Sequence, residues 1–181
     1  MDAIGMIELN SIARGIETAD HMVKAANVEL IMAKPVCPGK YVILISGDVG
    51  SVESSVKVGE EIGAQYVVDK LLIPRVHHQL IGAINQATEI NDVNAVGVLE
   101  YFSIATAIVG ADAAAKTAQV ELIEVRLGIG IGGKAFVTLS GDISAVHAAV
   151  EAGAKVGKDN GFLVNKAVIP SPSKEVFAKL L

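Results

Sequence analysis

The chain has one cysteine, no tryptophan and an aromatic content of only 4% in 181 residues. A single cysteine excludes a disulfide within the chain. Charged residues make up 19% of the sequence, below the roughly 25% of an average soluble domain. Acidic residues outnumber basic ones by 20 to 15, so the formal net charge is −5. This balance argues against general nucleic-acid binding, which requires a basic surface.

The sequence also lacks long hydrophobic runs. No stretch of about 18 apolar residues is free of charged or polar breaks, so no transmembrane helix is expected. The first residues show no basic region followed by an apolar core, so we expect no secretory signal and a cytoplasmic location. Hydrophobic residues nevertheless make up 51% of the chain, which excludes disorder. The excess of apolar over charged residues suggests that partner subunits cover some apolar surface.

The most informative feature is an internal repeat of about 90 residues. At an offset of 92, identical pairs recur at Gly5/Gly97, Glu8/Glu100, Ser11/Ser103, Asp20/Asp112, Lys24/Lys116 and Glu29/Glu121. The offset becomes 94 at Gly39-Lys40 and Gly133-Lys134, and 96 near the end of each copy. The polar stretch 89–94 separates the copies, so we predict domains at 1–91 and 92–181. Two similar domains in one chain favour a pseudo-symmetric assembly, in which three chains would contribute six similar domains.

Each copy has the same predicted element order, a strand, a helix, two strands, a helix, a strand and a final short helix. In the first copy we predict strands at 4–9, 28–33, 41–46 and 66–73, and helices at 12–26, 51–62 and 77–87. Ser11 and Asp48 are predicted helix N-caps. Two prolines and a glycine predict a loop over residues 35–40. This order is typical of an α+β, ferredoxin-like fold, here present twice in tandem.

Three motifs resemble those of bacterial microcompartment shell proteins. The first, A-D-x-x-x-K, occurs at Ala19–Lys24 and again at Ala111–Lys116. The others run from Gly39 to Asp48, with a second copy from Gly133 to Asp142, and from Ile73 through Pro74 and Arg75 to His77. The resemblance covers essentially the whole chain and implies two tandem βαββαβα microcompartment domains. It implies a structural protein without enzymatic activity, located in a microcompartment, with other shell proteins as partners and no nucleic acid or membrane.

The resemblance extends to the tandem-domain subclass, whose homotrimers imitate hexameric tiles as pseudohexamers. One kind, found in propanediol-utilisation shells, carries an iron–sulfur cluster at its central pore. Its pore loop is similar to Pro35, Val36, Cys37, Pro38, Gly39 and Lys40. The second copy departs from this pattern, because it has no cysteine and is two residues longer, with Gly128, Ile129, Gly130, Ile131, Gly132, Gly133 and Lys134.

One cysteine cannot hold an iron–sulfur cluster, which takes about four ligands. A three-fold axis beside Cys37 would bring three thiolates together, enough to bind a [4Fe–4S] cluster shared by three subunits. The resemblance implies electron transfer across the shell, with a lumenal or cytosolic redox enzyme as partner, or delivery of the cluster to an enzyme. The residues alone leave a buried, unreactive cysteine open, although prolines and glycine favour a surface loop.

Two other functions remain open at this point. One is a shell tile with an open metabolite pore and no cluster. The other is a ferredoxin-like trimeric regulator that binds a metabolite between subunits. The letters Gly128-x-Gly130-x-x-Gly133 match the dinucleotide fingerprint, but we predict a strand after them where the fingerprint requires a helix.

The remaining charged residues can be interpreted either as structural surface residues or as functional ones. Lys40 and Lys134 are either solvated strand-end lysines or a positive pore rim. By resemblance, Lys24, Lys116 and Arg75 lie at the tile edge, although Ser171-Pro172-Ser173 replaces Arg75-Val76-His77 in the second copy. Glu8 and Glu100 are interpreted as structural. Because His77 and His78 are adjacent, we expect them to point in different directions and not to share a metal.

Overall fold

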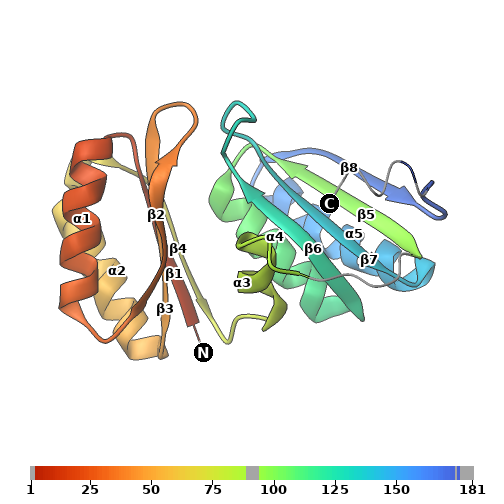
Figure 1. Cartoon of the computed structure of the whole chain (residues 1–181), viewed down its shortest axis with the longest axis horizontal. Coiled ribbons are helices and arrows are strands. Elements are labelled where there is room, and N and C mark those ends of the chain that lie inside the picture. The colour runs from red at the N-terminus through yellow and green to blue at the C-terminus, as the bar shows by residue number, and fades with distance from the viewer. Residues whose placement is uncertain (1–2, 89–93, 174, 176–181) are drawn as a thin grey trace. The chain divides into compact units, whose positions relative to one another are not determined.

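The computed structural model describes residues 3–88, 94–173 and 175. Two compact units are present, one formed by residues 1–76 with 128–133 and the other by residues 77–127 with 134–181. Each unit is built on a four-stranded sheet with two long helices on one face (Figure 1). The predicted α+β class with two tandem domains is therefore confirmed.

The first sheet has the strand order β2-β3-β1-β4, and every neighbouring pair is antiparallel. This is the ferredoxin-like order, in which each helix connects two strands that are not neighbours. The elements are β1 (Ala3–Leu9), α1 (Ile12–Ala25), β2 (Glu29–Val36), β3 (Lys40–Gly47), α2 (Val49–Gly63), a short 3₁₀ helix (Ala64–Tyr66) and β4 (Val67–Pro74).

The second sheet repeats this topology with the order β6-β7-β5-β8. Its elements are β5 (Ala95–Tyr101), α4 (Ile104–Thr117), β6 (Val120–Leu127), β7 (Ala135–Gly141), α5 (Ile143–Asp159) and β8 (Leu163–Ile169). The final helix predicted for the second copy falls on residues that lie almost entirely outside the described part of the chain.

The helix starts follow from capping residues. Ser11 Oγ accepts the Arg14 N–H at 3.3 Å, and Asp48 Oδ1 accepts the Ser51 N–H at 2.9 Å. Both side chains satisfy backbone donors that the first helical turn leaves free. The two predicted N-caps are therefore confirmed.

Each unit has a tyrosine in its core, but from a different position in the repeat. Tyr41 on β3 packs against Gly15 of α1, where an added Cβ would lie 2.5 Å from the ring. Tyr101 on β5 packs against Gly110 of α4, where an added Cβ would lie 2.3 Å from its hydroxyl oxygen. The Tyr101 hydroxyl donates to the Gly153 carbonyl at 3.0 Å, which satisfies a fully buried side chain. In each core a tyrosine ring therefore packs against a helical glycine, but the tyrosine comes from β3 in the first unit and from β5 in the second.

The short helix α3 (Gln79–Ile84) lies along the outer edge of β6 (Figure 1). Leu80 and Ile84 are buried, with 0% and 6% of their surface exposed. The Gln79 Oε1 accepts the Leu122 N–H at 3.0 Å, so the helix satisfies a backbone donor of an edge strand. Covering an edge in this way prevents unwanted strand pairing.

Candidate functional site

The only cysteine lies in the turn of the β2–β3 hairpin. This turn is shorter than the predicted loop over 35–40, because Pro35 and Val36 continue β2 and pair with Tyr41 and Lys40. Proline is tolerated here because β2 is an edge strand and needs no outward-facing donor at that position. Only residues 37–39 form the turn, which is closed by the Gly39 N–H donating to the Val36 carbonyl at 3.0 Å.

Cys37 is a free, half-buried cysteine whose backbone is fixed by the glycine-rich loop 128–133. The Cys37 N–H donates to the Gly128 carbonyl at 2.9 Å. A Cβ on Gly133 would lie 3.0 Å from the Cys37 carbonyl oxygen and 3.1 Å from Pro38 Cδ, so a side chain there would crowd the turn. Gly133 also has a φ of +83°, a conformation that side chains other than glycine rarely adopt. The two predicted pore loops therefore lie against each other within the first compact unit.

The loop beside the cysteine is open on its other side. An added Cβ on Gly130 or Gly132 would have no heavy atom within 4 Å, apart from its own chain neighbours. Ile129 is 46% exposed. Cys37 is consequently anchored through its backbone, and no large side chain is required to pack over this loop.

One chain supplies too few ligands for an iron–sulfur cluster, so Cys37 could bind one only together with other copies of the chain. In the described part of the chain, no cluster of three His, Cys, Asp or Glu residues is arranged to hold a metal. A thiolate is the usual ligand of such a cluster, and Cys37 supplies one per chain. Several copies of Cys37 must therefore meet before this residue can bind one.

The two predicted rim lysines are each paired with the first-strand glutamate of their own domain. Lys40 Nζ lies 3.0 Å from Glu8 Oε1, and the Glu8 side chain is only 4% exposed. Lys134 donates to Glu100 Oε1 at 2.8 Å, but there the carboxylate is 34% exposed. Both lysines therefore neutralise the glutamate on the first strand of their own domain, and the Lys40–Glu8 pair is much more deeply buried than the Lys134–Glu100 pair.

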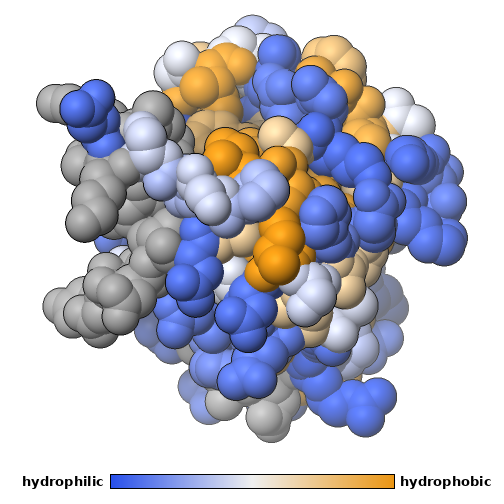
Figure 2. Space-filling model, turned by 90° about the vertical axis from the view of Figure 1, so that its right-hand side faces the viewer, coloured by the Kyte–Doolittle hydropathy of each residue, from blue (hydrophilic) through white to orange (hydrophobic). Residues whose placement is uncertain are grey.

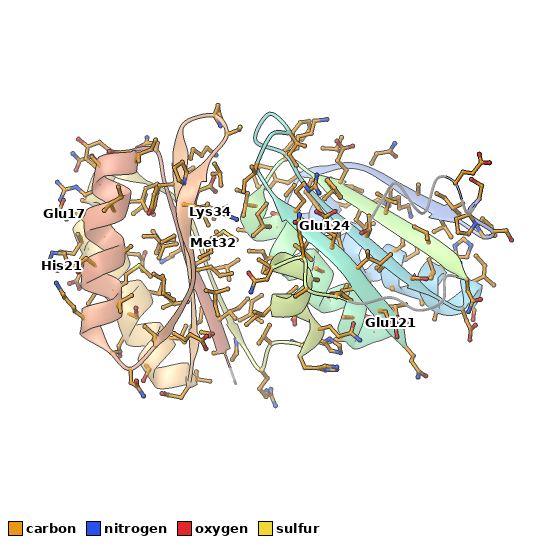
Figure 3. All side chains as sticks on the ribbon, viewed as in Figure 1. Glu17, His21, Met32, Lys34, Glu121 and Glu124 are labelled. Carbon is orange, nitrogen blue, oxygen red and sulfur yellow. The ribbon has the colours of Figure 1, made fainter. Side chains whose placement is uncertain are left out.

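The predicted edge residues Lys24 and Lys116 each bind the aspartate four residues earlier in the helix. Lys24 Nζ donates to Asp20 at 2.6 Å, and Lys116 Nζ donates to Asp112 at 2.5 Å. Arg75 is exposed immediately after β4. Glu17 and His21 project from α1 on the side away from the sheet, as Figure 3 shows.

The prediction that His77 and His78 point in different directions is wrong, because their ring centroids lie 4.4 Å apart. The backbone N–H of His77 donates to Asp112 Oδ1 at 2.8 Å. Burial lowers the pKa of His77, and the neighbouring His78 lowers it further. The His77 Nδ1 atom is buried without a hydrogen-bond partner among the described residues.

The surface retains substantial apolar area. Phe102 and Phe162 are 59% and 42% exposed and adjacent, with the Phe102 N–H donating to the Phe162 carbonyl at 2.9 Å. Figure 2 shows apolar residues gathered in a band between hydrophilic residues on one face. Such surface often marks an interaction site. No helix in the described residues is both long and apolar enough to span a membrane.

Comparisons with known proteins agree with the duplicated fold. Residues 3–76 and 95–172 each match the BMC domain family. The bacterial microcompartment shell protein PduT of Citrobacter freundii is 37% identical over 179 residues, which is 99% of this chain and 97% of that protein. The carboxysome shell protein CcmK2 of Synechocystis sp. is 35% identical over 82 residues, covering 43% of this chain and 80% of that protein.

A crystal structure of a microcompartment protein from Desulfitobacterium hafniense has a TM-score of 0.94 at 53% identity. The match covers 98% of this chain and 99% of that one. Both domains and their order are therefore shared with known shell components, which are structural proteins and not enzymes. The chain belongs to the bacterial microcompartment shell proteins and carries two BMC domains in tandem.

Proposed function

We propose that this structural shell protein forms a homotrimer of six BMC domains, in which three copies of Cys37 bind one [4Fe–4S] cluster at a central pore. The observation that carries the proposal is the position of Cys37. It is the only cysteine of the chain, and it lies half-buried in the turn between β2 and β3, against a loop rich in glycine. A three-fold axis beside this turn brings three thiolates to one point.

The residues around Cys37 hold its backbone in place. The strands β2 and β3 fix both ends of the turn, and the Cys37 N–H is held by the Gly128 carbonyl. In the trimer, three Cys37 thiolates would hold the cluster, and water or a small anion would supply the remaining ligand. When bound, the cluster supplies one-electron chemistry. The trimer then blocks metabolites at the pore and exchanges single electrons, or the cluster itself, with a redox enzyme on one side of the shell.

The test is the iron and acid-labile sulfide content of protein purified without oxygen, together with an EPR spectrum after reduction. About four irons and four sulfides per three chains are expected. Cys37→Ala should remove all bound iron and leave the trimer intact, as measured by light scattering. The matched control is Ile129→Ala, which changes an exposed side chain of the neighbouring loop and should leave the iron content unchanged.

Two outcomes would contradict the proposal in different ways. A confirmed trimer that takes up no iron during anaerobic reconstitution would be a shell tile whose pore carries small molecules. A stable monomer under native conditions would contradict the assembly itself.

A further inference from the structure

The two hairpins that carry the predicted pore loops differ in how far their strands stay paired. In the first domain the pairing of β2 with β3 continues to Val36 and Lys40, which leaves only residues 37–39 as the turn. In the second domain the pairing of β6 with β7 already ends at Leu127 and Ala135. Residues 128–134 are therefore outside the sheet, a longer opening than the two-residue insertion alone requires.

The early end of this pairing changes what one backbone carbonyl does. The Val36 carbonyl closes its own turn by accepting the Gly39 N–H at 3.0 Å. With the offset of 92, Gly128 matches Val36, and it lies just beyond the last pair of β6 and β7. Its carbonyl instead accepts the Cys37 N–H at 2.9 Å. The second hairpin thus uses this group to hold the turn of the first.

A pair of matched glycines shows the same change of role. Gly39 and Gly133 have nearly equal φ angles of +80° and +83°, so both hairpins keep this backbone conformation. A Cβ on Gly39 would meet no heavy atom within 4 Å, apart from its own chain neighbours. A Cβ on Gly133 would lie 3.0 Å from the Cys37 carbonyl oxygen and 3.1 Å from Pro38 Cδ. Glycine is therefore required at 133 by a contact as well as by φ.

This contact leaves the cysteine turn little room to move. Adding a Cβ at such distances forces its neighbours to shift by a few tenths of an ångström. The ligands of a metal site must be held within about 0.5 Å of their productive positions. In a trimer the same shift would occur at all three copies of Cys37. A small displacement of the turn therefore matters most at a site built from three chains.

We propose that the loop 128–133 of the second repeat is the positioning element for Cys37, and that Gly133 is the residue on which this position depends. The first repeat supplies the ligand. The second repeat, whose loop has no cysteine, supplies the carbonyl and the close-fitting backbone that hold it. Both glycines act through the backbone of the Cys37 turn and not on the cluster. The inference rests on the proposed function and adds a role for the longer second loop.

Gly133→Ala tests this role through the retention of iron. After anaerobic reconstitution, the variant should lose iron to a chelator about 10- to 100-fold faster than the wild-type protein, the usual effect of removing the support of a metal ligand. The reduction potential and the EPR signal of the remaining cluster should change, while light scattering should show an intact trimer. A purely structural glycine would change stability without changing the potential or the EPR signal.

Two further variants separate the contact from backbone strain. Gly130→Ala imposes the same kind of strain, because Gly130 has a φ of +72°, but its Cβ would meet no heavy atom within 4 Å. This variant should retain iron as the wild-type protein does. Gly133→Asn reduces the strain, since asparagine tolerates a positive φ, but keeps the Cβ contact with the turn. It should lose iron as quickly as Gly133→Ala.

Hydrogen exchange of the Cys37 amide gives a measurement that requires no cluster. In wild-type protein prepared without iron, the hydrogen bond to the Gly128 carbonyl should protect this amide. Gly133→Ala should increase its exchange rate, and Gly130→Ala should leave the rate unchanged. An unprotected Cys37 amide in the wild-type protein would overturn the proposal, even if no variant could be purified.

The iron measurements distinguish a failure of this proposal from a failure of the proposed function. Equal rates of iron loss from the wild-type protein and Gly133→Ala would overturn the positioning role and leave the cluster standing. Equally fast loss from Gly130→Ala and Gly133→Ala would also overturn it, because strain alone would then explain the effect. A wild-type trimer that takes up no iron would contradict the proposed function, and the positioning role with it.

Discussion

Lys40→Met is expected to destabilise the protein strongly, because it leaves the Glu8 carboxylate unpaired inside the first domain. The Glu8 side chain is 4% exposed and its ammonium partner lies 3.0 Å away. Removing one partner of a buried pair costs roughly 3–5 kcal/mol. Lys40 retains 30% of its side-chain exposure, so water screens part of this interaction and we expect about 2–4 kcal/mol.

The second domain supplies a matched control. Lys134→Met breaks the corresponding pair with Glu100, but the two side chains are 41% and 34% exposed. Pairs of this exposure contribute only about 0–1 kcal/mol. A pore-rim function for the lysines gives no reason for the two variants to differ in stability, whereas the difference in burial does.

The assay is urea unfolding, with hydrogen exchange of the β1 amides to locate the loss in the first domain. The double variant Glu8→Gln with Lys40→Met removes the unpaired charge and should recover most of the stability. Equal losses for Lys40→Met and Lys134→Met would refute the reasoning. So would a double variant no more stable than Lys40→Met alone.

Three further changes test the cores and the helix ends. Gly110→Ala should destabilise the protein by about 1–3 kcal/mol in thermal unfolding, because the new Cβ would lie 2.3 Å from the buried Tyr101 hydroxyl. An increase in stability, as expected for alanine at an exposed helical glycine, would contradict this packing. Burial lowers the pKa of His77 below its ordinary value of 6.5, so the unfolded protein takes up a proton on this side chain at a higher pH than the folded protein does. The stability of the folded protein should therefore fall as the pH drops below 6.5. His77→Asn should remove this part of the pH dependence of Tm. Asp48→Ala should lower Tm more than Asp142→Ala, because only Asp48 caps its helix through its side chain; equal effects would argue against the cap.

The order of strands and helices could be predicted because it depends on local signals. The caps at Ser11 and Asp48 and the apolar periodicity between them act over a few residues. The end of β2 could not be predicted, since prolines usually end a strand. Pro35 is accommodated only because β2 lies at the sheet edge, and that is a property of the whole sheet.

The surroundings of the predicted pore residues also depend on distant parts of the chain. Glu8 lies opposite Val42, which makes Lys40 its diagonal neighbour on the same face, and only the β1–β3 register reveals this. The contact of Cys37 with Gly128 joins two loops that the sequence could identify only as separate matches of the repeat. That Cys37 binds a cluster stays a prediction.

The placement of the two tyrosines restricts how the halves of this chain can recombine. A gene conversion that joined β5 to α1 would set the Tyr101 ring against Thr18, at the position where the second half has Gly110. The reciprocal product would leave Leu9 facing a glycine, with a cavity in place of the ring. Each first strand therefore fits only its own first helix, and exchanging β1 and β5 between the two halves is expected to destabilise both domains.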